Sequence, residues 1–326
     1  MKIVILDDWF DTLSGLPCFK ILNGYDVTVF KDHVKDIDEL AKRLKPYDII
    51  ILFRDRTVIS APLIKQLPNL KLVSQRGDFA HVDVHSCTKQ GILLCSETTN
   101  NLPRNSAAEL TLALILAAMR KIPQQMANMR AGKWQLGVGK SLYGRTLGLY
   151  GYGRIAKLVE SYAECFGMKV IWWGSEAGRA RAYDDGKIIP NSREDFFSSS
   201  DVVSLHVRLT SETRHIIKVT DFAHTSLRTI FVNTARAGLV ENGAILGALN
   251  SGRLGMAALD VFNEEPIYNA NDPLLNHENV ICTPHIGFVT EDELELQFSD
   301  VFKQVVGFIC GKPFNVVNPK ALKKRF

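Results

Sequence analysis

Several features that assign a chain to a particular class of protein are missing here. The longest apolar run, residues 110–119, is interrupted by Thr111 and is too short to cross a bilayer. The start, Met1 to Asp8, has the character of a buried strand and is too short for a secretion signal. The net charge is only +4 over 326 residues, with no long basic block. These absences predict a cytoplasmic protein that binds neither membranes nor nucleic acid.

Metal-binding patterns are absent as well. The six cysteines are scattered, with no Cys-x-x-Cys pair and no histidine at ligand spacing, so the sequence predicts no metal site. We expect the cysteines to be small buried thiols in a reducing compartment. There is no repeat, low-complexity tract or Gly/Ser linker. With 23% charged and 46% hydrophobic residues, the composition is typical of a globular protein, and the length favours two domains.

Short apolar runs alternate with helical patterns from the first residue onward, which is typical of α/β proteins with parallel sheets. The pattern predicts strands at 2–6, 26–30, 49–53, 72–75 and 92–95, then at 147–150, 169–173, 202–206, 230–233, 256–261 and 280–282. It predicts helices at 37–44, 62–66, 106–120, after Gly153, and at 291–310.

One strand of this series runs directly into a glycine-rich turn. The segment from Thr146 to Ala156 contains Gly151-x-Gly153-x-x-Ala156 and is followed by a helical pattern. Gly151 permits the tight turn, Gly153 lets the backbone approach a pyrophosphate, and the small Ala156 allows close packing of helix on strand. The helix N-terminus would supply free N–H groups for the phosphates. Because strand and helix flank the turn, we interpret it as a dinucleotide fingerprint.

The domain arrangement follows from the order of these elements. The simplest arrangement returns the last helix to the first α/β unit. The sequence therefore predicts two doubly wound parallel-sheet domains, with a Rossmann dinucleotide-binding domain (101–286) inserted into a flavodoxin-like substrate domain (1–100 and 287–326). The two crossings are expected near Thr98–Leu102 and His285–Gly287.

The end of the next strand bears on the form of the cofactor. NAD sites place an acidic residue there to hold the ribose hydroxyls, but the corresponding position is Gly174. Ser175 follows, with Arg179 and Arg181 close behind, and this set could accommodate the 2′-phosphate of NADP. Glu176 could instead reach back and serve NAD. The missing acid favours NADP over NAD.

Three later strands are each followed by a residue whose side chain can act in catalysis, namely Arg236, Glu265 and His285. Taken singly, each has a structural alternative: an exposed loop arginine, a solvated turn glutamate and a satisfied core histidine. Together, behind a dinucleotide fingerprint, they suit hydride transfer to a 2-keto acid. An arginine fork binds the carboxylate and keto oxygen, and a histidine oriented by a carboxylate exchanges the proton.

The sequence resembles the D-isomer-specific 2-hydroxyacid dehydrogenases, the family of phosphoglycerate dehydrogenase and of the hydroxypyruvate and glyoxylate reductases. The resemblance covers about residues 48–319 and rests on motifs at 105–114, 147–153, 201–206, 232–236, 258–262 and 283–285. It implies Arg236 as substrate binder, Glu265 as the partner of the histidine and His285 as acid/base. It further implies cofactor contacts by Arg154, Ile155, His206, Thr234, Ala235 and Asp260, and a homodimer formed through the dinucleotide-binding domains around residues 106–120.

The chain departs from the family pattern at three places. The substrate loop, residues 74–83, has one glycine, Gly77, between Arg76 and Asp78, and Asp78 opposes an anion unless Arg76 offsets it. Arg208 replaces a usual proline and is either a surface residue or a further contact to a 2′-phosphate. Arg54 keeps a second anionic group on the substrate possible. We therefore predict Arg54, Arg76, Gly77 and Arg236 as substrate-binding residues.

Two functions remain open from the sequence. The first is an NAD(P)-dependent oxidoreductase that transfers hydride between nicotinamide and C2 of a small D-2-hydroxy acid or 2-keto acid. The second is a dinucleotide-sensing interaction protein resembling the corepressors of the same fold, which can retain the site residues. Turnover discriminates between them, and the lack of disordered tails and basic faces favours the enzyme.

Overall fold

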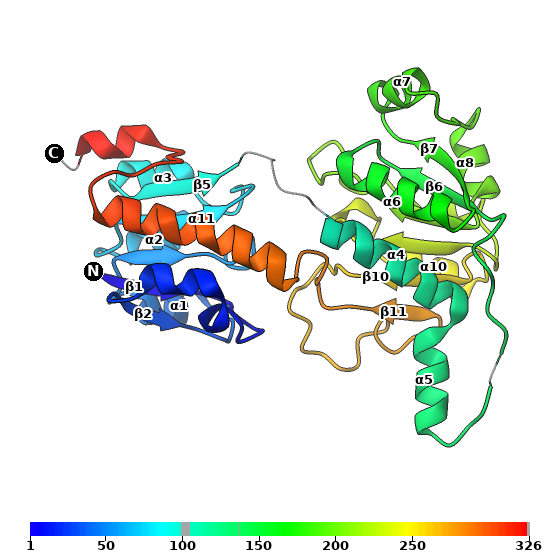
Figure 1. The fold of residues 1–326 in the computed structure, drawn as a ribbon, viewed down its shortest axis with the longest axis horizontal. Helices are drawn as coiled ribbons and strands as arrows, with labels where there is room; N and C mark the ends of the chain where they lie inside the picture. Colours follow the sequence, from blue (N-terminus) through cyan, green and yellow to red (C-terminus); the bar gives the residue numbers. More distant parts are fainter. Residues whose placement is uncertain (99–104, 136, 325–326) are drawn as a thin grey trace. The chain divides into compact units, whose positions relative to one another are not determined.

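The computed structural model describes residues 1–98, 105–135 and 137–324. The chain forms two compact units, residues 1–102 with 290–326 (unit 1) and residues 103–289 (unit 2), which are drawn in Figure 1. The first expected crossing, Thr98–Leu102, lies almost entirely outside the described residues. The second change of unit falls between Val289 and Thr290, just after the expected His285–Gly287.

Unit 1 is built on a parallel five-stranded sheet in the order β2-β1-β3-β4-β5, which is the flavodoxin-like order. The strands are β1 (Lys2–Ile5), β2 (Asp26–Val29), β3 (Ile49–Ile51), β4 (Leu72–Arg76) and β5 (Leu93–Glu97). The helices are α1 (Ile37–Leu44), α2 (Ala61–Lys65), α3 (Val84–Lys89) and α11 (Glu291–Ile309), with 3-10 helices η1 (Leu13–Gly15), η2 (Pro17–Leu22) and η4 (Pro319–Lys324).

Both faces of this sheet are covered, which explains why the central strand β3 is apolar and buried throughout. Val4, Ile50, Val73 and Leu94 point to the face covered by α1, α2 and α3. On the other face α11 packs on β4 and β5, and it can be followed in Figure 1 as the long orange helix. The side chain of Thr290 caps α11 by accepting from the N–H of Glu293. Glu293 and Gln297, in the first turns of this helix, accept hydrogen bonds from Arg54, which follows β3.

Unit 2 holds a parallel six-stranded sheet in the order β11-β10-β9-β8-β6-β7. The strands are β6 (Thr146–Tyr150), β7 (Lys169–Trp173), β8 (Val202–Leu205), β9 (Ile230–Asn233), β10 (Met256–Leu259) and β11 (Val280–Cys282). The helices are α4 (Asn105–Arg120), α5 (Ile122–Arg130), α6 (Arg154–Cys165), α7 (Glu176–Asp184), α8 (Arg193–Ser199), α9 (Val219–Phe222) and α10 (Ala244–Asn250), with 3-10 helix η3 (Ala237–Leu239). The predicted fold class, two doubly wound parallel sheets, is confirmed.

A Rossmann sheet in the usual order has a third strand beyond β7. In this chain the segment after α7 takes that place, and the carbonyl of Ile188 accepts from the N–H of Trp172 at 2.9 Å. Ile189 packs against the core of unit 2. The segment thus covers the β7 edge without forming a named strand.

The helices of unit 2 divide between the two faces of its sheet. Leu149 and Trp172 lie in the core cluster that also holds buried residues of α4 and α6, whereas Leu205 and Phe231 lie in the cluster with residues of α8, α9 and α10. In the described ranges no helix is long and apolar enough to cross a membrane.

The expectation of buried cysteines is correct for some positions and wrong for others. Cys18, Cys87 and Cys95 are buried, and burial raises the pKa of each thiol to about 12. Cys165 and Cys310, near the ends of α6 and α11, are exposed. Cys165 is the last residue of α6 and Cys310 directly follows α11, so both lie at helix ends that face solvent.

Candidate active site

The glycine turn after β6 has the geometry that the fingerprint predicts. Gly151 has φ of +114°, and a Cβ placed there would lie 2.6 Å from the carbonyl oxygen of His206. A side chain at this position is therefore excluded by both the backbone conformation and the neighbouring strand end. Gly153 is different, because a Cβ there would meet only the His206 oxygen, at 4.0 Å. The fold of unit 2 would therefore tolerate a side chain at position 153. The open space beside Gly153 suits a ligand phosphate that approaches the backbone closely.

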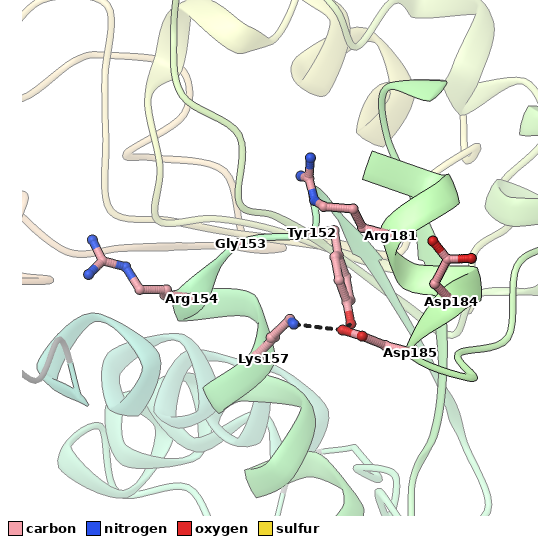
Figure 2. A pocket seen from close by; sticks show the side chains of 7 residues that line it. All are labelled: Tyr152, Gly153, Arg154, Lys157, Arg181, Asp184 and Asp185. Atoms are coloured by element: carbon pink, nitrogen blue, oxygen red, sulfur yellow. Dashed lines mark hydrogen bonds and ion pairs between the residues drawn. The ribbon is translucent and has the colours of Figure 1, made fainter. Parts of the chain in front are cut away.

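Helix α6 begins at Arg154 with Gly153 as its N-cap, and its first turn carries no acidic residue. Beside it lies a cavity of about 380 Å³ lined by Tyr152, Gly153, Arg154, Lys157, Arg181, Asp184 and Asp185. Figure 2 shows the Lys157 ammonium directed at Asp185, at 2.8 Å, while Arg154 extends the opposite way. The Tyr152 hydroxyl donates to the same carboxylate. The N–H groups of a helix start and an exposed arginine together form a suitable surface for a pyrophosphate.

The end of β7 has glycine where an NAD site has an acid, and an arginine side chain from α7 packs against it. Gly174 is followed by Ser175, whose hydroxyl caps α7 by accepting from Gly178 N at 3.2 Å. The Arg179 guanidinium lies 4.3 Å above the Trp173 ring and donates to the Gly174 carbonyl at 2.9 Å. Arg179 is therefore held against the strand end, whereas Arg181 and Arg208 are exposed.

His206 follows β8 and faces the glycine turn. Its main-chain N–H donates to Tyr150 O at 2.9 Å, and its ring Nε2 lies 2.9 Å from the hydroxyl of Ser204. Burial lowers the pKa of His206 from 6.5 to about 4. The ring is thus neutral at physiological pH, and the main-chain carbonyl of the same residue lies against Gly151.

Three adjacent strands place the predicted catalytic residues at one edge of the sheet. Leu259, the last residue of β10, pairs in register with Asn233 of β9 and with Cys282 of β11. Arg236 lies three residues beyond Asn233, and His285 lies three beyond Cys282. Parallel strands end at the same edge, so these side chains leave neighbouring strands on one side of unit 2.

The turn that leads to Arg236 is held by its own polar groups. The Asn233 amide accepts from Ala235 N at 3.0 Å and donates to Arg236 O at 3.0 Å. The Thr234 hydroxyl lies 2.8 Å from that of Thr111 on α4. One terminal nitrogen of Arg236 donates to the carbonyl of Ala235. Backbone and guanidinium are therefore positioned before any ligand binds.

Asp260 organises the segment that carries the histidine. It is fully buried, and its Oδ1 accepts from the Thr283 hydroxyl at 2.6 Å and from Ile286 N at 2.9 Å. Its Oδ2 accepts from Gly287 N at 2.9 Å. Desolvation raises the pKa of Asp260, and these three bonds oppose that rise. A carboxylate has about four acceptor positions, so Oδ2 retains capacity for a further donor such as a carboxamide.

His285 and Glu265 form a hydrogen-bonded pair. The ring Nδ1 lies 2.6 Å from Glu265 Oε2, and Glu265 Oε1 accepts from Phe262 N at 2.8 Å. The two side chains are 20% and 28% exposed, and the Phe288 ring stands edge-on to the imidazole. His285 has φ of +53°, a left-handed conformation that residues other than glycine adopt rarely. A carboxylate on Nδ1 fixes Nε2 as the atom that exchanges a proton.

The three substrate-binding residues predicted in unit 1 all have partners within that unit. Arg54 donates to Glu293 and Gln297 of α11, and Arg76 is paired with Asp300 of the same helix. The N–H of Gly77 donates to the carbonyl of Glu97 at 2.9 Å. That N–H is therefore engaged within unit 1.

The sequence did not predict the clamp made by Asp260 or the bond between Thr111 and Thr234. Each joins residues that are distant in the sequence. The only hint in the sequence was a threonine in or beside each motif, namely Thr111, Thr234 and Thr283. Across the described segments no three His, Cys, Asp or Glu side chains gather as a group that could hold a metal ion.

Comparisons with known proteins identify the family. Residues 112–287 match the model described as "D-isomer specific 2-hydroxyacid dehydrogenase, NAD binding domain". Glyoxylate reductase of Aeropyrum pernix is 34% identical over 92% of this chain and 92% of its own length. D-3-phosphoglycerate dehydrogenase of Methanocaldococcus jannaschii is 35% identical over 86% of this chain. The chain spans about half of that relative's length, 53%.

A solved structure extends the likeness to three dimensions. Phosphoglycerate oxidoreductase of Vibrio cholerae superposes with a TM-score of 0.90 at 40% identity, over 95% of this chain and 99% of that chain. The matched model places the NAD-binding domain within unit 2, as an insertion in the rest of the chain. On these grounds the chain belongs to the D-isomer-specific 2-hydroxyacid dehydrogenase family.

Proposed function

We propose that the protein transfers hydride between a nicotinamide dinucleotide and C2 of a small D-2-hydroxy acid or 2-keto acid. The observation that carries the proposal is the bond of 2.6 Å between His285 Nδ1 and Glu265 Oε2, on the sheet edge that also carries Arg236. Similarity to glyoxylate reductase, hydroxypyruvate reductase and D-3-phosphoglycerate dehydrogenase supports the reaction class.

Each residue has a distinct role in this proposal. Arg236 binds the substrate carboxylate and the C2 oxygen with its planar fork. His285 protonates the C2 oxygen from Nε2 during reduction and accepts that proton during oxidation. Glu265 holds the ring through Nδ1 and stabilises the imidazolium. The bound dinucleotide supplies or accepts the hydride.

The residues present fit a dinucleotide. The space beside Gly153 and the start of α6 suit the pyrophosphate, with Arg154 and Ile155 in the first turn. Gly174, Ser175 and His206 would surround the adenosine ribose, and Thr234, Ala235 and Asp260 would hold the carboxamide. Position 174 lacks a carboxylate and Arg179 is held against it, which supports NADP over NAD. Titration of the protein with NADPH and NADH, with Arg179→Ala as the variant, tests the preference.

Turnover tests the function itself. We would follow the absorbance of NADPH or NADH in the presence of glyoxylate, hydroxypyruvate, pyruvate, phenylpyruvate, 2-ketoglutarate and phosphohydroxypyruvate. Oxidation of either cofactor with one of these acids is the expected result. Tight dinucleotide binding without turnover of any acid would contradict the proposal.

We also propose that two copies associate through the dinucleotide-binding domains. Helix α5 buries none of its residues within the chain, and Met129 and Trp134 are 62% and 74% exposed. Apolar side chains gathered on one protruding segment favour a protein partner. Light scattering after size-exclusion chromatography should give a mass twice that of one chain. In Met129→Glu the measured mass should fall to that of a single chain.

A further inference from the structure

The carboxyl edge of the unit 1 sheet carries three arginines beside a natural ligand position. Arg54 and Arg56 follow β3, and Arg76 ends β4. Open α/β sheets bind ligands outside the carboxyl ends of their strands, at the point where the strand order changes direction. In the order β2-β1-β3-β4-β5 that point lies between β1 and β3. Arg54 therefore stands next to it.

Arg54 is closed into a triangle by two residues of α11. Its Nη2 donates to Glu293 Oε1 at 3.0 Å, and its Nε donates to Gln297 Oε1 at 3.1 Å. Gln297 Nε2 donates in turn to Glu293 Oε1 at 2.9 Å. The Nε and Nη2 edge of a guanidinium is one that takes a carboxylate or phosphate in two bonds. In this chain that edge already faces an internal carboxylate.

The triangle is a fixed feature of the unit. Glu293 and Gln297 are four residues apart on α11 and so share one face of the helix. The Glu293 side chain is 14% exposed, and Gln297 is buried. Arg54 itself has φ of +56°, a strained conformation that is kept only where the surroundings demand it. The bonds to Glu293 and Gln297 hold the guanidinium against α11.

The other two arginines also have partners within unit 1: aromatic rings enclose Arg56, and a carboxylate pairs with Arg76. The Arg56 guanidinium lies 4.0 Å from the centre of the Trp9 ring and 4.2 Å from that of Phe53, and it donates to the carbonyl of Asp7 at 2.6 Å. Arg76 is paired with Asp300, and its side chain is 12% exposed. Each of the three arginines therefore has an acceptor or an aromatic enclosure within unit 1.

We propose that Glu293 determines specificity by acting through Arg54, so that the substrate is a monocarboxylate whose far end is small and neutral. A second anionic group, whether phosphate or carboxylate, would approach Arg54 beside the Glu293 carboxylate, and like charges oppose such binding. A hydrogen, methyl or hydroxymethyl end meets no such repulsion. The inference rests on the proposed function and on the ligand position at the carboxyl edge of the unit 1 sheet.

Hydroxypyruvate and phosphohydroxypyruvate provide the test, because they share a carbon skeleton and differ by one phosphate. The wild-type protein should show the higher kcat/KM with hydroxypyruvate. Glu293→Gln removes the charge but keeps the shape, and it should raise kcat/KM for phosphohydroxypyruvate about tenfold relative to hydroxypyruvate, through KM and not kcat. Glu293→Asp keeps the charge and should retain the wild-type preference.

Glu291→Gln is the matched control, since Glu291 is an exposed residue of the same helix, and it should leave the ratio unchanged. A wild-type preference for phosphohydroxypyruvate would overturn the inference while leaving the proposed function intact. An equal change for both substrates in Glu293→Gln would also overturn it, because it would indicate a structural role. If the wild-type protein reduced neither acid nor any other in the panel, the proposed function would fail and the inference with it.

Discussion

Replacing Glu265 by glutamine separates the pairing with His285 from the packing around it. Glutamine has the same shape, so its oxygen can still accept from Phe262 N, as Glu265 Oε1 does at 2.8 Å. Its amide, however, presents N–H to His285 Nδ1 in place of a carboxylate oxygen at 2.6 Å. The imidazolium that forms when His285 accepts the substrate proton then loses its anionic partner.

The magnitude follows from the bond that is lost. A hydrogen bond to a charged group contributes about 1.5–3 kcal/mol, and partial exposure of both side chains favours about 2 kcal/mol here. At 1.36 kcal/mol per factor of ten, the chemical step should slow about 30-fold. The effect belongs in kcat for oxidation of the hydroxy acid, because the positive charge develops only in the transition state.

Stopped-flow absorbance of the reduced nicotinamide in a single turnover measures that step. Dinucleotide affinity should stay within a factor of about two, since Glu265 lies outside the glycine turn and α6. Glu264→Gln, at the exposed neighbouring position, serves as the control and should retain the wild-type rate. A Glu265→Gln rate within threefold of wild type, or an equal loss in Glu264→Gln, would refute the pairing as the basis of catalysis.

Three other perturbations probe separate parts of the account. Arg236→Lys should lower kcat/KM at least about 100-fold, because an ammonium cannot form the planar fork; a near-normal value in steady-state assays would remove Arg236 from the site. Gly151→Ala should cost about 2–4 kcal/mol in urea unfolding, since its Cβ would lie 2.6 Å from the His206 oxygen, whereas Gly153→Ala should keep its stability and weaken dinucleotide binding; equal stabilities would contradict this. The pKa of His206 is lowered from 6.5 to about 4, so the unfolded chain binds more protons in this window, and the contribution of His206 to the unfolding free energy should fall by roughly 2–3 kcal/mol from pH 6.5 to pH 4. The total fall should be smaller by that amount in His206→Gln, and an unchanged fall would count against the burial of the ring.

Local signals in the sequence explain why the dinucleotide turn was predictable. Gly151 and Gly153 lie between an apolar strand and a helix, so the strand, the tight turn and the helix start are all encoded within a few residues of each other. The strand ends near Arg236 and His285 could be located in the same way, because parallel strands are short apolar runs bounded by polar residues. Their common edge follows from the parallel order of β9, β10 and β11.

Contacts between distant residues were beyond the same reasoning. Arg54 and Glu293 are 239 residues apart, and their bond depends on how α11 packs over β4. Asp260 was predicted as a cofactor contact, but its three bonds to residues 283–287 depend on the register of β10 with β11. The exposure of Cys165 and Cys310 likewise depends on which side of each helix end packs against the core.

Isotope transfer tests the central claim most directly. The protein would be incubated with a 2-keto acid and a reduced dinucleotide that carries deuterium at the transferable position, and the product would be analysed by mass spectrometry and chiral chromatography. The account predicts one deuterium at C2 of a D-2-hydroxy acid, and its near loss in His285→Ala despite unchanged dinucleotide affinity. Product without deuterium at C2, or undiminished transfer in His285→Ala, would contradict it.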